Sequence, residues 1–323
     1  MNISIVGAGV SGIFAAKTLV ELGHHSTIIE KKSSIGGRMA THPIGNGHAD
    51  SGAQFFTVRS KELSALTDEW LESGLVKKWF GDDFPRYTGI NGMGPFIKSL
   101  SEDLEISLNE QVTFLSFDQE RVNVISSIRE SLYDAVILTA PVPQSLKLLK
   151  NSPGVLSPSS EKILYASAFR PCLVGLISLT ETLEIGEKGI ISENLPDGVD
   201  KIIANDQKGI SSTPVLSIYM DADWSEAHYN QVEENILEEI ISSLNKILSP
   251  RIISKKLLKR WRYAEAVNVY RQPFLRLDQK PIFLAGDSFL TKNDSSGRTR
   301  VESAILSGIY TGRAVHQELS INK

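Results

Sequence analysis

The chain has 323 residues, a formal net charge of −4 and no long run of lysine or arginine, so it lacks the basic surface with which proteins bind nucleic acid. Its length is enough for two lobes, because single hydrophobic cores stop growing at about 250 to 300 residues. Its single cysteine excludes an internal disulfide framework, and no apolar stretch reaches the roughly 18 residues that span a bilayer. We therefore expect a cytoplasmic protein of two lobes without nucleic-acid or membrane partners.

The amino-terminal segment combines a short apolar run with closely spaced glycines. Residues 3–6 are typical of a buried strand, and the residues after the glycines are typical of a helix that ends at Gly23. The first glycine permits a tight strand-to-helix turn, the second lets the backbone approach a pyrophosphate, and the third lets the helix pack closely. This spacing predicts a dinucleotide site made by Gly7, Ala8, Gly9, Val10, Ser11 and Gly12.

A second apolar run, residues 26–30, ends at Glu30, a carboxylate about 20 residues after the glycines, where a ribose hydroxyl needs an acceptor. Lys31 adds a positive charge beside it. A pair of glycines then lets the backbone run against a ligand, and the arginine that follows offers a planar cation suited to a phosphate or to ring stacking. We predict that this turn contributes Gly36, Gly37, Arg38 and Met39 to the same dinucleotide site.

Between this turn and the second lobe, the sequence predicts a helix, a hairpin and a strand. Residues 60–80 carry an apolar stripe at helical spacing, and the alternation over residues 111–127 is typical of a hairpin. Residues 133–139 have the pattern of a further strand of the nucleotide sheet. Ala140 and the proline after it interrupt this strand, which exposes backbone beside the dinucleotide.

A second lobe is predicted from about residue 142 to residue 270. Its strands are short and its one long helix is amphipathic, a pattern that favours a mixed sheet with helical cover. Cys172 falls in the first of these strands, where a buried packing role is favoured over a reactive thiol. The predicted elements are strands over 172–179, 189–192, 201–205 and 214–220, and a helix over 231–248.

The nucleotide signals resume at Pro281. The apolar run from this residue ends at Gly286 and Asp287, which places a carboxylate at the carboxyl edge of a sheet, where open α/β folds bind ligands. We expect Asp287 to accept a hydrogen bond from a ribityl hydroxyl. Residues 301–308 begin a helix whose free amide groups can face a flavin carbonyl or a pyrophosphate. The predicted site therefore also includes Glu302 and Ser303.

Together these segments resemble the FAD-dependent amine oxidase superfamily and, among its branches, the renalase-like proteins. The superfamily resemblance is carried by the glycine and carboxylate motifs at both ends of the chain. The renalase-like resemblance is carried by Asp50-Ser-Gly-Ala-Gln-Phe-Phe-Thr57 and Arg260-Trp-Arg-Tyr-Ala264. One position departs from the superfamily pattern. Ser34 stands where an arginine often precedes the paired glycines, and Lys31 or Lys32 is the candidate replacement.

The resemblance implies an α/β fold, in which a glutathione-reductase-like (Rossmann) FAD-binding domain carries an inserted mixed α+β substrate domain. Residues 1–60 are expected to form the first part of the FAD-binding domain, and residues 61–141 to carry helical and hairpin segments back to it. Residues 142–270 are expected to form mainly the substrate domain, and residues 271–323 to complete the FAD-binding domain. FAD is expected to be non-covalent, because the one cysteine is far in sequence from the carboxyl-terminal motif at which covalent members attach theirs.

The resemblance also implies the chemistry. Renalase-like enzymes oxidise the 2- and 6-dihydro isomers of NAD(P)H to NAD(P)+, with oxygen as acceptor and hydrogen peroxide as product, whereas the broader superfamily oxidises amines. Hydride transfer to flavin N5 needs no dedicated acid or base, so no catalytic residue is assigned. No metal is expected, because the six histidines are scattered.

The substrate pocket is expected to stack a planar ring on aromatic side chains and to pair an arginine with a carboxamide or phosphate. A strand that packs against the FAD-binding lobe is an equally good interpretation of Trp261 and Tyr263, and surface exposure is favoured for Arg59. Two alternatives stay open: oxidation of an amine or another small substrate, and a flavoprotein whose FAD is structural or non-redox. The candidate pocket residues are Gln54, Phe55, Phe56, Arg59, Trp261, Arg262 and Tyr263.

Overall fold

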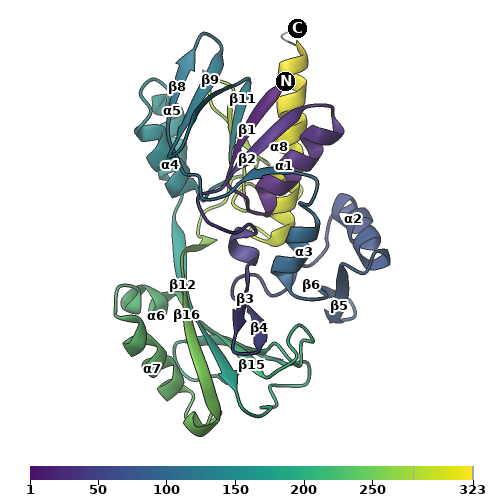
Figure 1. Ribbon diagram of the computed structural model, residues 1–323, viewed down its shortest axis with the longest axis vertical. Helices are drawn as coiled ribbons and strands as arrows, with labels where there is room; N and C mark the ends of the chain where they lie inside the picture. The colour runs from purple at the N-terminus through teal and green to yellow at the C-terminus, as the bar shows by residue number, and fades with distance from the viewer. Residues whose placement is uncertain (279, 322–323) are drawn as a thin grey trace. The chain divides into compact units, whose positions relative to one another are not determined.

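The computed structural model describes residues 1–278 and 280–321, and its chain forms two compact units (Figure 1). Unit 1 combines Met1–Gly37 and Ile97–Ala168 with the described residues from Ala266 onward. Unit 2 combines Arg38–Phe96 with Phe169–Glu265. Each unit has a central sheet of its own.

Unit 1 is built on a six-stranded sheet in the order β17-β18-β11-β1-β2-β7. β17 is antiparallel to β18, and the other neighbouring strands run parallel. Buried side chains fill β11 and β18 completely, as expected for parallel strands covered on both faces. The strands are β1 (Asn2–Val6), β2 (His25–Ile29), β7 (Glu105–Ser107), β11 (Ala135–Leu138), β17 (Leu275–Arg276) and β18 (Ile282–Leu284).

Helices from opposite ends of the chain pack together in unit 1. They are α1 (Val10–Glu21), which follows β1, and α8 (Val301–Ile321), and Figure 1 shows them side by side. Gly308 permits the close approach, because a Cβ atom there would lie 2.3 Å from the carbonyl oxygen of Ser11. The predicted nucleotide-binding helix is therefore held in place by the last helix of the chain.

A three-stranded antiparallel sheet in unit 1 contains the predicted hairpin and one further strand. Helix α4 packs on α5 and on β8 of this sheet. Ser157 caps α5, because its Oγ accepts a hydrogen bond from Ser160 N at 3.2 Å. These elements are β8 (Val112–Asp118), β9 (Arg121–Ser126), β10 (Glu130–Tyr133), α4 (Val142–Lys150) and α5 (Pro158–Tyr165). The chain enters this part of unit 1 from unit 2 within helix α3 (Met93–Ser99).

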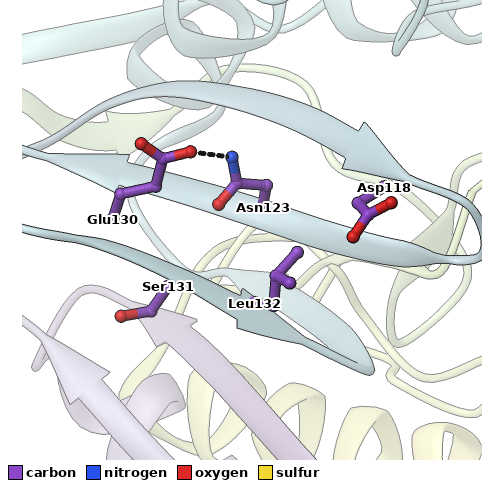
Figure 2. Close-up of a pocket in the computed structure, with 5 residues that line it drawn as sticks. All are labelled: Asp118, Asn123, Glu130, Ser131 and Leu132. Atoms are coloured by element: carbon purple, nitrogen blue, oxygen red, sulfur yellow. Dashed lines mark hydrogen bonds between the residues drawn. The ribbon is translucent and has the colours of Figure 1, made fainter.

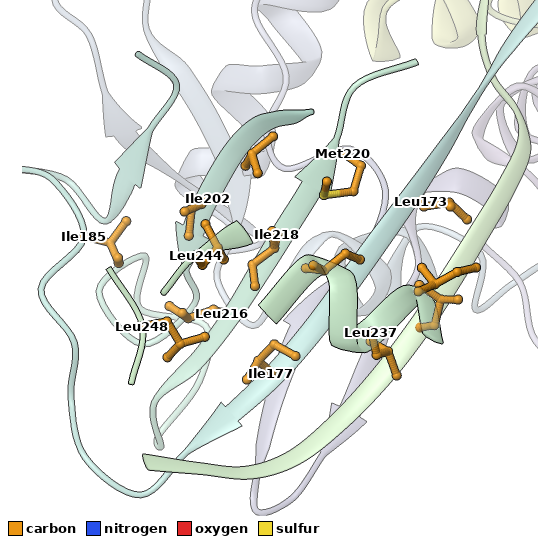
Figure 3. Close-up of a cluster of buried hydrophobic side chains, with 14 of the residues drawn as sticks. Leu173, Ile177, Ile185, Ile202, Leu216, Ile218, Met220, Leu237, Leu244 and Leu248 are labelled. Carbon is orange, nitrogen blue, oxygen red and sulfur yellow. The ribbon is translucent and has the colours of Figure 1, made fainter. Parts of the chain in front are cut away.

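Unit 2 is built on a five-stranded sheet in the order β13-β14-β15-β12-β16. Its side chains alternate between two faces, so that Leu216 and Ile218 join one apolar cluster and Val215 and Tyr219 join another. Figure 3 shows the first cluster, to which α7 contributes Leu237. The elements are β12 (Phe169–Leu179), β13 (Ile190–Ile191), β14 (Val199–Ala204), β15 (Val215–Met220), α6 (Ala222–His228), α7 (Glu233–Ser243) and β16 (Ile253–Ala266).

The second face of this sheet packs against short strands that come from the first part of the chain. β4 contacts β15, and β3 contacts β12. Ile44 and Ala49 are their buried contributions to the second apolar cluster. The remaining elements of unit 2 include β3 (Thr41–Ile44), β4 (Gly47–Asp50), α2 (Lys61–Glu72), β5 (Val76–Phe80), β6 (Arg86–Gly89) and the 3-10 turns η1 (Gly37–Met39) and η2 (Pro250–Ile252).

Two of the predicted elements need correction. The helix expected over residues 60–80 ends at Glu72, because Gly74 adopts φ +69° and the chain then turns into β5, which pairs with β6. The 14-residue strand β16 is not among the predicted elements, because charged residues such as Lys255 and Lys256 interrupt its apolar alternation. Its part around Trp261 and Tyr263 agrees with the strand that was one of the two interpretations of these residues. The hairpin of unit 1 and the four short strands and amphipathic helix of the second lobe are confirmed to within a few residues.

The predicted domain boundaries also differ from the two units. Residues 38–96 belong to unit 2 rather than to the nucleotide lobe, because β3 and β4 pack on the unit 2 sheet. Residues 142–168 belong to unit 1 rather than to the substrate lobe, because α4 packs on β8. Unit 2 is therefore made from two insertions, and the chain passes between the units after Gly37, Phe96, Ala168 and Glu265.

Candidate functional site

The carboxyl ends of four parallel strands meet at one edge of the unit 1 sheet. Val6, at the end of β1, lies opposite Ile29 of β2 and Leu138 of β11, and Leu138 lies opposite Leu284 of β18. At such an edge, open α/β sheets bind their ligands. The residues just beyond these four strand ends include the predicted ligands Gly7, Glu30, Ala140 and Gly286.

The three glycines of the first turn are required for different reasons. Gly7 has φ +113°, and a Cβ atom on Gly12 would lie 2.1 Å from the Gly7 carbonyl oxygen, so the turn itself needs both. Gly9 has extended backbone angles that any residue adopts, φ −78° and ψ 173°, and an added Cβ would meet no atom within 4 Å. The space beside Gly9 is therefore open to a ligand, at a helix amino terminus whose N–H groups favour phosphate.

Glu30 and the second glycine turn border the same loop. The Glu30 carboxylate accepts hydrogen bonds from the backbone N–H groups of Ala8 and Lys32, each at 2.9 Å. Gly36 N donates to the Ala8 carbonyl oxygen at 2.8 Å, and Gly36 forms an isolated bridge with Gly9. Two predicted ligands thus lie beside the glycine turn, and one is a carboxylate of the kind that accepts from a ribose hydroxyl.

The neighbouring candidates are distributed between the units. Lys31 is exposed, and its Nζ donates to Gln144 Oε1 at 3.1 Å. Arg38 and Met39 belong to unit 2, where Arg38 Nη1 donates to the Ala264 carbonyl oxygen at 3.1 Å and Met39 is buried. Their contribution to a dinucleotide site stays a prediction.

At the other end of the chain, α8 holds the turn after β18. Gly286 has φ +150°, and its N–H donates to Ser307 Oγ at 2.9 Å. Ser303 Oγ lies 3.1 Å from the Asp287 carbonyl oxygen, to which it donates. The Asp287 side chain is thereby carried on a turn that is fixed by two serines of α8.

Glu302 is part of an ion-pair network at the start of α8. It is buried, and its carboxylate accepts a hydrogen bond from Arg300 Nη1 at 2.5 Å, while Arg300 also pairs with Asp294 Oδ2 at 2.7 Å. Negative charge near a helix amino terminus is stabilising. The network thus stabilises this terminus, and direct binding of a ligand by Glu302 stays a prediction.

These groups fit a dinucleotide. The open space beside Gly9 would take a pyrophosphate against the first turn of α1, and the turns at Glu30 and Asp287 supply carboxylates for sugar or ribityl hydroxyls. The arrangement gathers both ends of the chain at one sheet edge, as the sequence predicts.

In unit 2, strand alternation separates the predicted pocket residues of β16. Trp261 packs against the second apolar cluster, and its Nε1 donates to the Ser51 carbonyl oxygen at 2.6 Å. Tyr263 shares the side of Trp261 because it lies two residues further along the strand. Arg262 points to the opposite face, where its guanidinium pairs with Glu226 at 3.0 Å. The structure thus does not bring Arg262 together with Trp261.

The residues of the predicted aromatic segment also differ in their surroundings. Phe55 is half-buried and meets the Trp79 ring edge-on, with centroids 6.2 Å apart. Phe56 is a core residue, because it is 2% exposed and packs in a cluster of aromatic rings. Arg59 is exposed, as favoured from the sequence. We use the name aromatic face for Phe55, Trp79, Tyr219 and Trp261.

Sequence reasoning missed a fully buried lysine behind the aromatic face. The Nζ atom of Lys208 donates to Asp50 Oδ2 at 2.7 Å and to Gln54 Oε1 at 2.9 Å, and it lies 5.1 Å from the Trp79 ring centroid. Burial lowers the pKa of Lys208, and the Asp50 carboxylate opposes that shift. No pattern predicts this residue, since it lies in a polar turn after β14, where lysine is usually exposed.

The lone cysteine has a packing environment. Cys172 lies in β12, and its Sγ donates to the Met220 carbonyl oxygen at 3.5 Å. Burial raises the pKa of the Cys172 thiol to about 12. A thiol with this pKa stays protonated near neutral pH, so the structure agrees with the packing interpretation.

Two other kinds of site, a metal cluster and a membrane-spanning helix, have no candidate in the part of the chain that the structure describes. Its His, Cys, Asp and Glu residues form no group of three that could hold a metal ion, and none of its helices is both long and apolar enough to cross a membrane. Figure 2 shows an open pocket on the β8-β9-β10 sheet, where Asn123 donates to Glu130. The pocket is lined by Asp118, Asn123, Glu130, Ser131 and Leu132, none of them a predicted site residue.

Comparison with protein families finds two matches. Residues 5–70 match a model described as an NAD(P)-binding Rossmann-like domain. Residues 74–316 match a model described as flavin containing amine oxidoreductase, which covers more than half of the chain.

Individual relatives match shorter stretches. Putrescine oxidase from Kocuria rosea is 34% identical over 68 residues, which are 21% of this chain and 14% of the relative. Flavin-dependent L-tryptophan oxidase from Lentzea aerocolonigenes is 47% identical over 46 residues, which are 14% of this chain and 10% of the relative. The matched stretches thus span 14% or less of these curated relatives. Among solved structures, cyclohexylamine oxidase from Brevibacterium oxydans IH-35A shares the fold, with a TM-score of 0.73 and 13% identity over 99% of both chains.

Proposed function

Because this chain belongs to the flavin containing amine oxidoreductase family and its cofactor is FAD, we propose that it is a renalase-like oxidase of dihydronicotinamide dinucleotides. Its proposed substrates are the 2- and 6-dihydro isomers of NAD(P)H. A hydride leaves the dihydropyridine ring, which becomes the aromatic pyridinium of NAD(P)+. FAD, when bound, would supply the hydride acceptor at N5. The two electrons and the one proton of the hydride, with a second proton from solvent, would then reduce oxygen to hydrogen peroxide.

The observation that carries this proposal is the chemistry of the aromatic face. Its half-buried rings, those of Phe55, Trp79 and Trp261, offer apolar surface, whereas Tyr219 is buried in the core. The Trp261 indole is fixed by its hydrogen bond to the Ser51 carbonyl oxygen. The charged groups behind it, Lys208 and Asp50, are buried and paired with each other. A surface of fixed rings suits a planar dihydropyridine, and it offers the orientation that hydride transfer requires.

The proposed FAD site uses residues of unit 1. The first turn of α1 beside Gly9 would hold the pyrophosphate, Glu30 would accept from the adenosine ribose, and Asp287 would accept from the ribityl chain. Gly36 and Ala140 would border the dinucleotide from the neighbouring turns. These residues bind and orient, and none of them is assigned a proton-transfer step.

The test is anaerobic mixing of the yellow protein with candidate reductants, with flavin absorbance as the readout. We expect 2- or 6-dihydro-NAD(P) to bleach the flavin in a fast phase, and ordinary NADH and simple monoamines to act far more slowly. Admission of oxygen should restore the colour and yield hydrogen peroxide. Trp261→Ala should slow the bleaching by about 100-fold, since a misplacement of about 1 Å has an effect of that order.

Trp224→Ala is the matched control, because the Trp224 ring stacks on His228 in α6, with centroids 3.9 Å apart, and is not part of the aromatic face. It should leave the rate of bleaching unchanged. Oxidation of an amine is the second candidate, favoured by the amine oxidases among the similar proteins. Fast bleaching by an amine without a response to the dihydropyridines would establish that alternative, and no bleaching by either class would favour a structural or non-redox FAD.

A further inference from the structure

The ammonium group of Lys208 is directed entirely into unit 2. It donates to Asp50 and Gln54, and the Trp79 ring lies beside it. Burial of a charge costs free energy unless the charge is paired and hydrogen-bonded, and a methionine of similar length would fill the same space without that cost. A lysine at this position is therefore explained by the hydrogen bonds that it donates to Asp50 and Gln54, and not by the space that it fills.

Asp50, the partner of Lys208, joins several elements of unit 2. Its Oδ1 accepts from Met93 N at 3.0 Å, and its own N–H donates to Asn205 Oδ1 at 3.3 Å. Its carbonyl oxygen accepts from Ser217 Oγ at 2.8 Å and from the Tyr219 hydroxyl at 3.2 Å. The end of β4 is therefore held against β15 and the turn after β14.

The turn over residues 50–54 follows from this arrangement. Because Lys208 donates to Gln54 Oε1, the other end of the amide is an N–H donor, and Nε2 lies 2.7 Å from the Asp50 carbonyl oxygen. This bond closes the turn. The Ser51 carbonyl oxygen within it accepts the hydrogen bond from Trp261 Nε1. The Gln54 side chain thus makes its hydrogen bonds inside unit 2. The turn can affect a substrate only through the positions of the rings beside it.

The geometry points to Lys208 as a positioning residue, which fixes the turn over residues 50–54 and thereby the Trp261 and Phe55 rings. The inference rests on the proposed function of the aromatic face. Lys208 does not touch the substrate and acts through Asp50 and Gln54. Its removal should loosen and misalign a bound planar substrate while FAD stays bound, since Gly9, Glu30 and Asp287, to which the main FAD contacts are assigned above, are in unit 1.

The decisive variant is the neutral pair Lys208→Met with Asp50→Asn, because Lys208→Met alone leaves a buried carboxylate without its cation. Gln54→Leu is the second variant, since it removes the link to the turn and keeps the ion pair. The matched control is Lys77→Met, because Lys77 Nζ donates to the carbonyl oxygen of Gly209, the residue after Lys208, at 2.9 Å.

Three readouts separate the possible roles: FAD content, the limiting rate and apparent Kd of anaerobic flavin reduction by 6-dihydro-NAD, and acrylamide quenching of Trp261, taken as the difference from Trp261→Phe. We expect both network variants to keep FAD, to lose about 100-fold in limiting rate, to raise the apparent Kd about tenfold, and to expose Trp261 to quenching. Lys77→Met should match the wild type in all three.

An unchanged rate, Kd and quenching in a folded, FAD-loaded Gln54→Leu or neutral-pair variant would overturn the inference. If the wild type is not reduced by any dihydropyridine, the proposed function fails. The quenching of Trp261 then decides the positioning role by itself, because that measurement needs no substrate.

Discussion

In unit 1, the groups proposed to bind FAD are glycine backbones and carboxylates at the carboxyl ends of parallel strands. In unit 2, by contrast, the polar side chains next to the aromatic face form hydrogen bonds with one another. An added Cβ at Gly9 meets no protein atom within 4 Å. Lys208, by contrast, has no exposed side-chain surface and is surrounded by partners. The predicted dinucleotide site is thus built largely from backbone and left open, while the proposed substrate surface adjoins a closed polar network. Each of the following changes tests one side of this contrast.

The largest effect is expected on the stability of the FAD-free protein, from a change in unit 2. Lys208→Met should lower the free energy of unfolding of the FAD-free protein by about 3 to 5 kcal/mol, because it leaves the buried Asp50 carboxylate without its cation. Urea denaturation followed by circular dichroism measures this change. The control is Lys78→Met, whose exposed ion pair with Asp82 should contribute little. Equal stability of Lys208→Met and the wild type would show that the network does not stabilise unit 2.

A pair of glycine variants should separate folding from ligand binding in unit 1. Gly12→Ala places a Cβ 2.1 Å from the Gly7 carbonyl oxygen, so it should destabilise the FAD-free protein by about 1 to 3 kcal/mol. Gly9→Ala should leave that stability within about 0.5 kcal/mol and still reduce FAD affinity about tenfold or more, because its methyl group enters the space proposed for the pyrophosphate. Denaturation and FAD titration of both variants measure the two effects. The contrast is lost if Gly9→Ala binds FAD as tightly as the wild type does.

The smallest effect is expected at Cys172. Burial raises its pKa to about 12 in the folded protein, whereas an unfolded cysteine has a pKa of about 8.5. At pH 9 the folded thiol should therefore resist iodoacetamide, and the urea-unfolded thiol should react. The unfolded state releases this proton first, so this group lowers the stability as the pH rises above about 8.5.

Cys172→Ala should keep FAD content and flavin reduction unchanged, and acid precipitation should release the flavin from both proteins. Rapid labelling of the folded protein, or flavin retained on the precipitated wild type and not on Cys172→Ala, would contradict the packing role.

Much of unit 1 could be predicted because its signals are local. A glycine turn, a carboxylate after the second strand and a Gly-Asp pair after a late strand each depend on a few adjacent residues, and the parallel sheet then brings their strand ends together. The domain boundaries could not be predicted in the same way. Residues 38–60 follow the nucleotide motif in sequence, yet the packing of β3 and β4 on a distant sheet places them in unit 2.

The network of unit 2 could not be predicted because its partners are far apart in the chain. Lys208 and Asp50 are separated by 158 residues, and a lysine in a polar turn carries no sign of burial. The opposite faces on which the β16 side chains lie were also not predicted. Arg262 and Trp261 are neighbours in sequence and both are predicted pocket residues, but in a strand neighbouring side chains point to opposite faces.

The chain passes four times between the two units, and these passages determine the order in which the units can be completed during synthesis. Helix α1 is synthesised before unit 2, but α8, against which it packs, begins only at Val301. All of unit 2 emerges before β18 and α8 can close the nucleotide sheet. While unit 2 is synthesised, the nucleotide sheet is therefore unfinished and part of its apolar surface is uncovered, a state in which chains are prone to aggregate. The glycine turn is made before unit 2, and its binding site is completed only after unit 2 has been made.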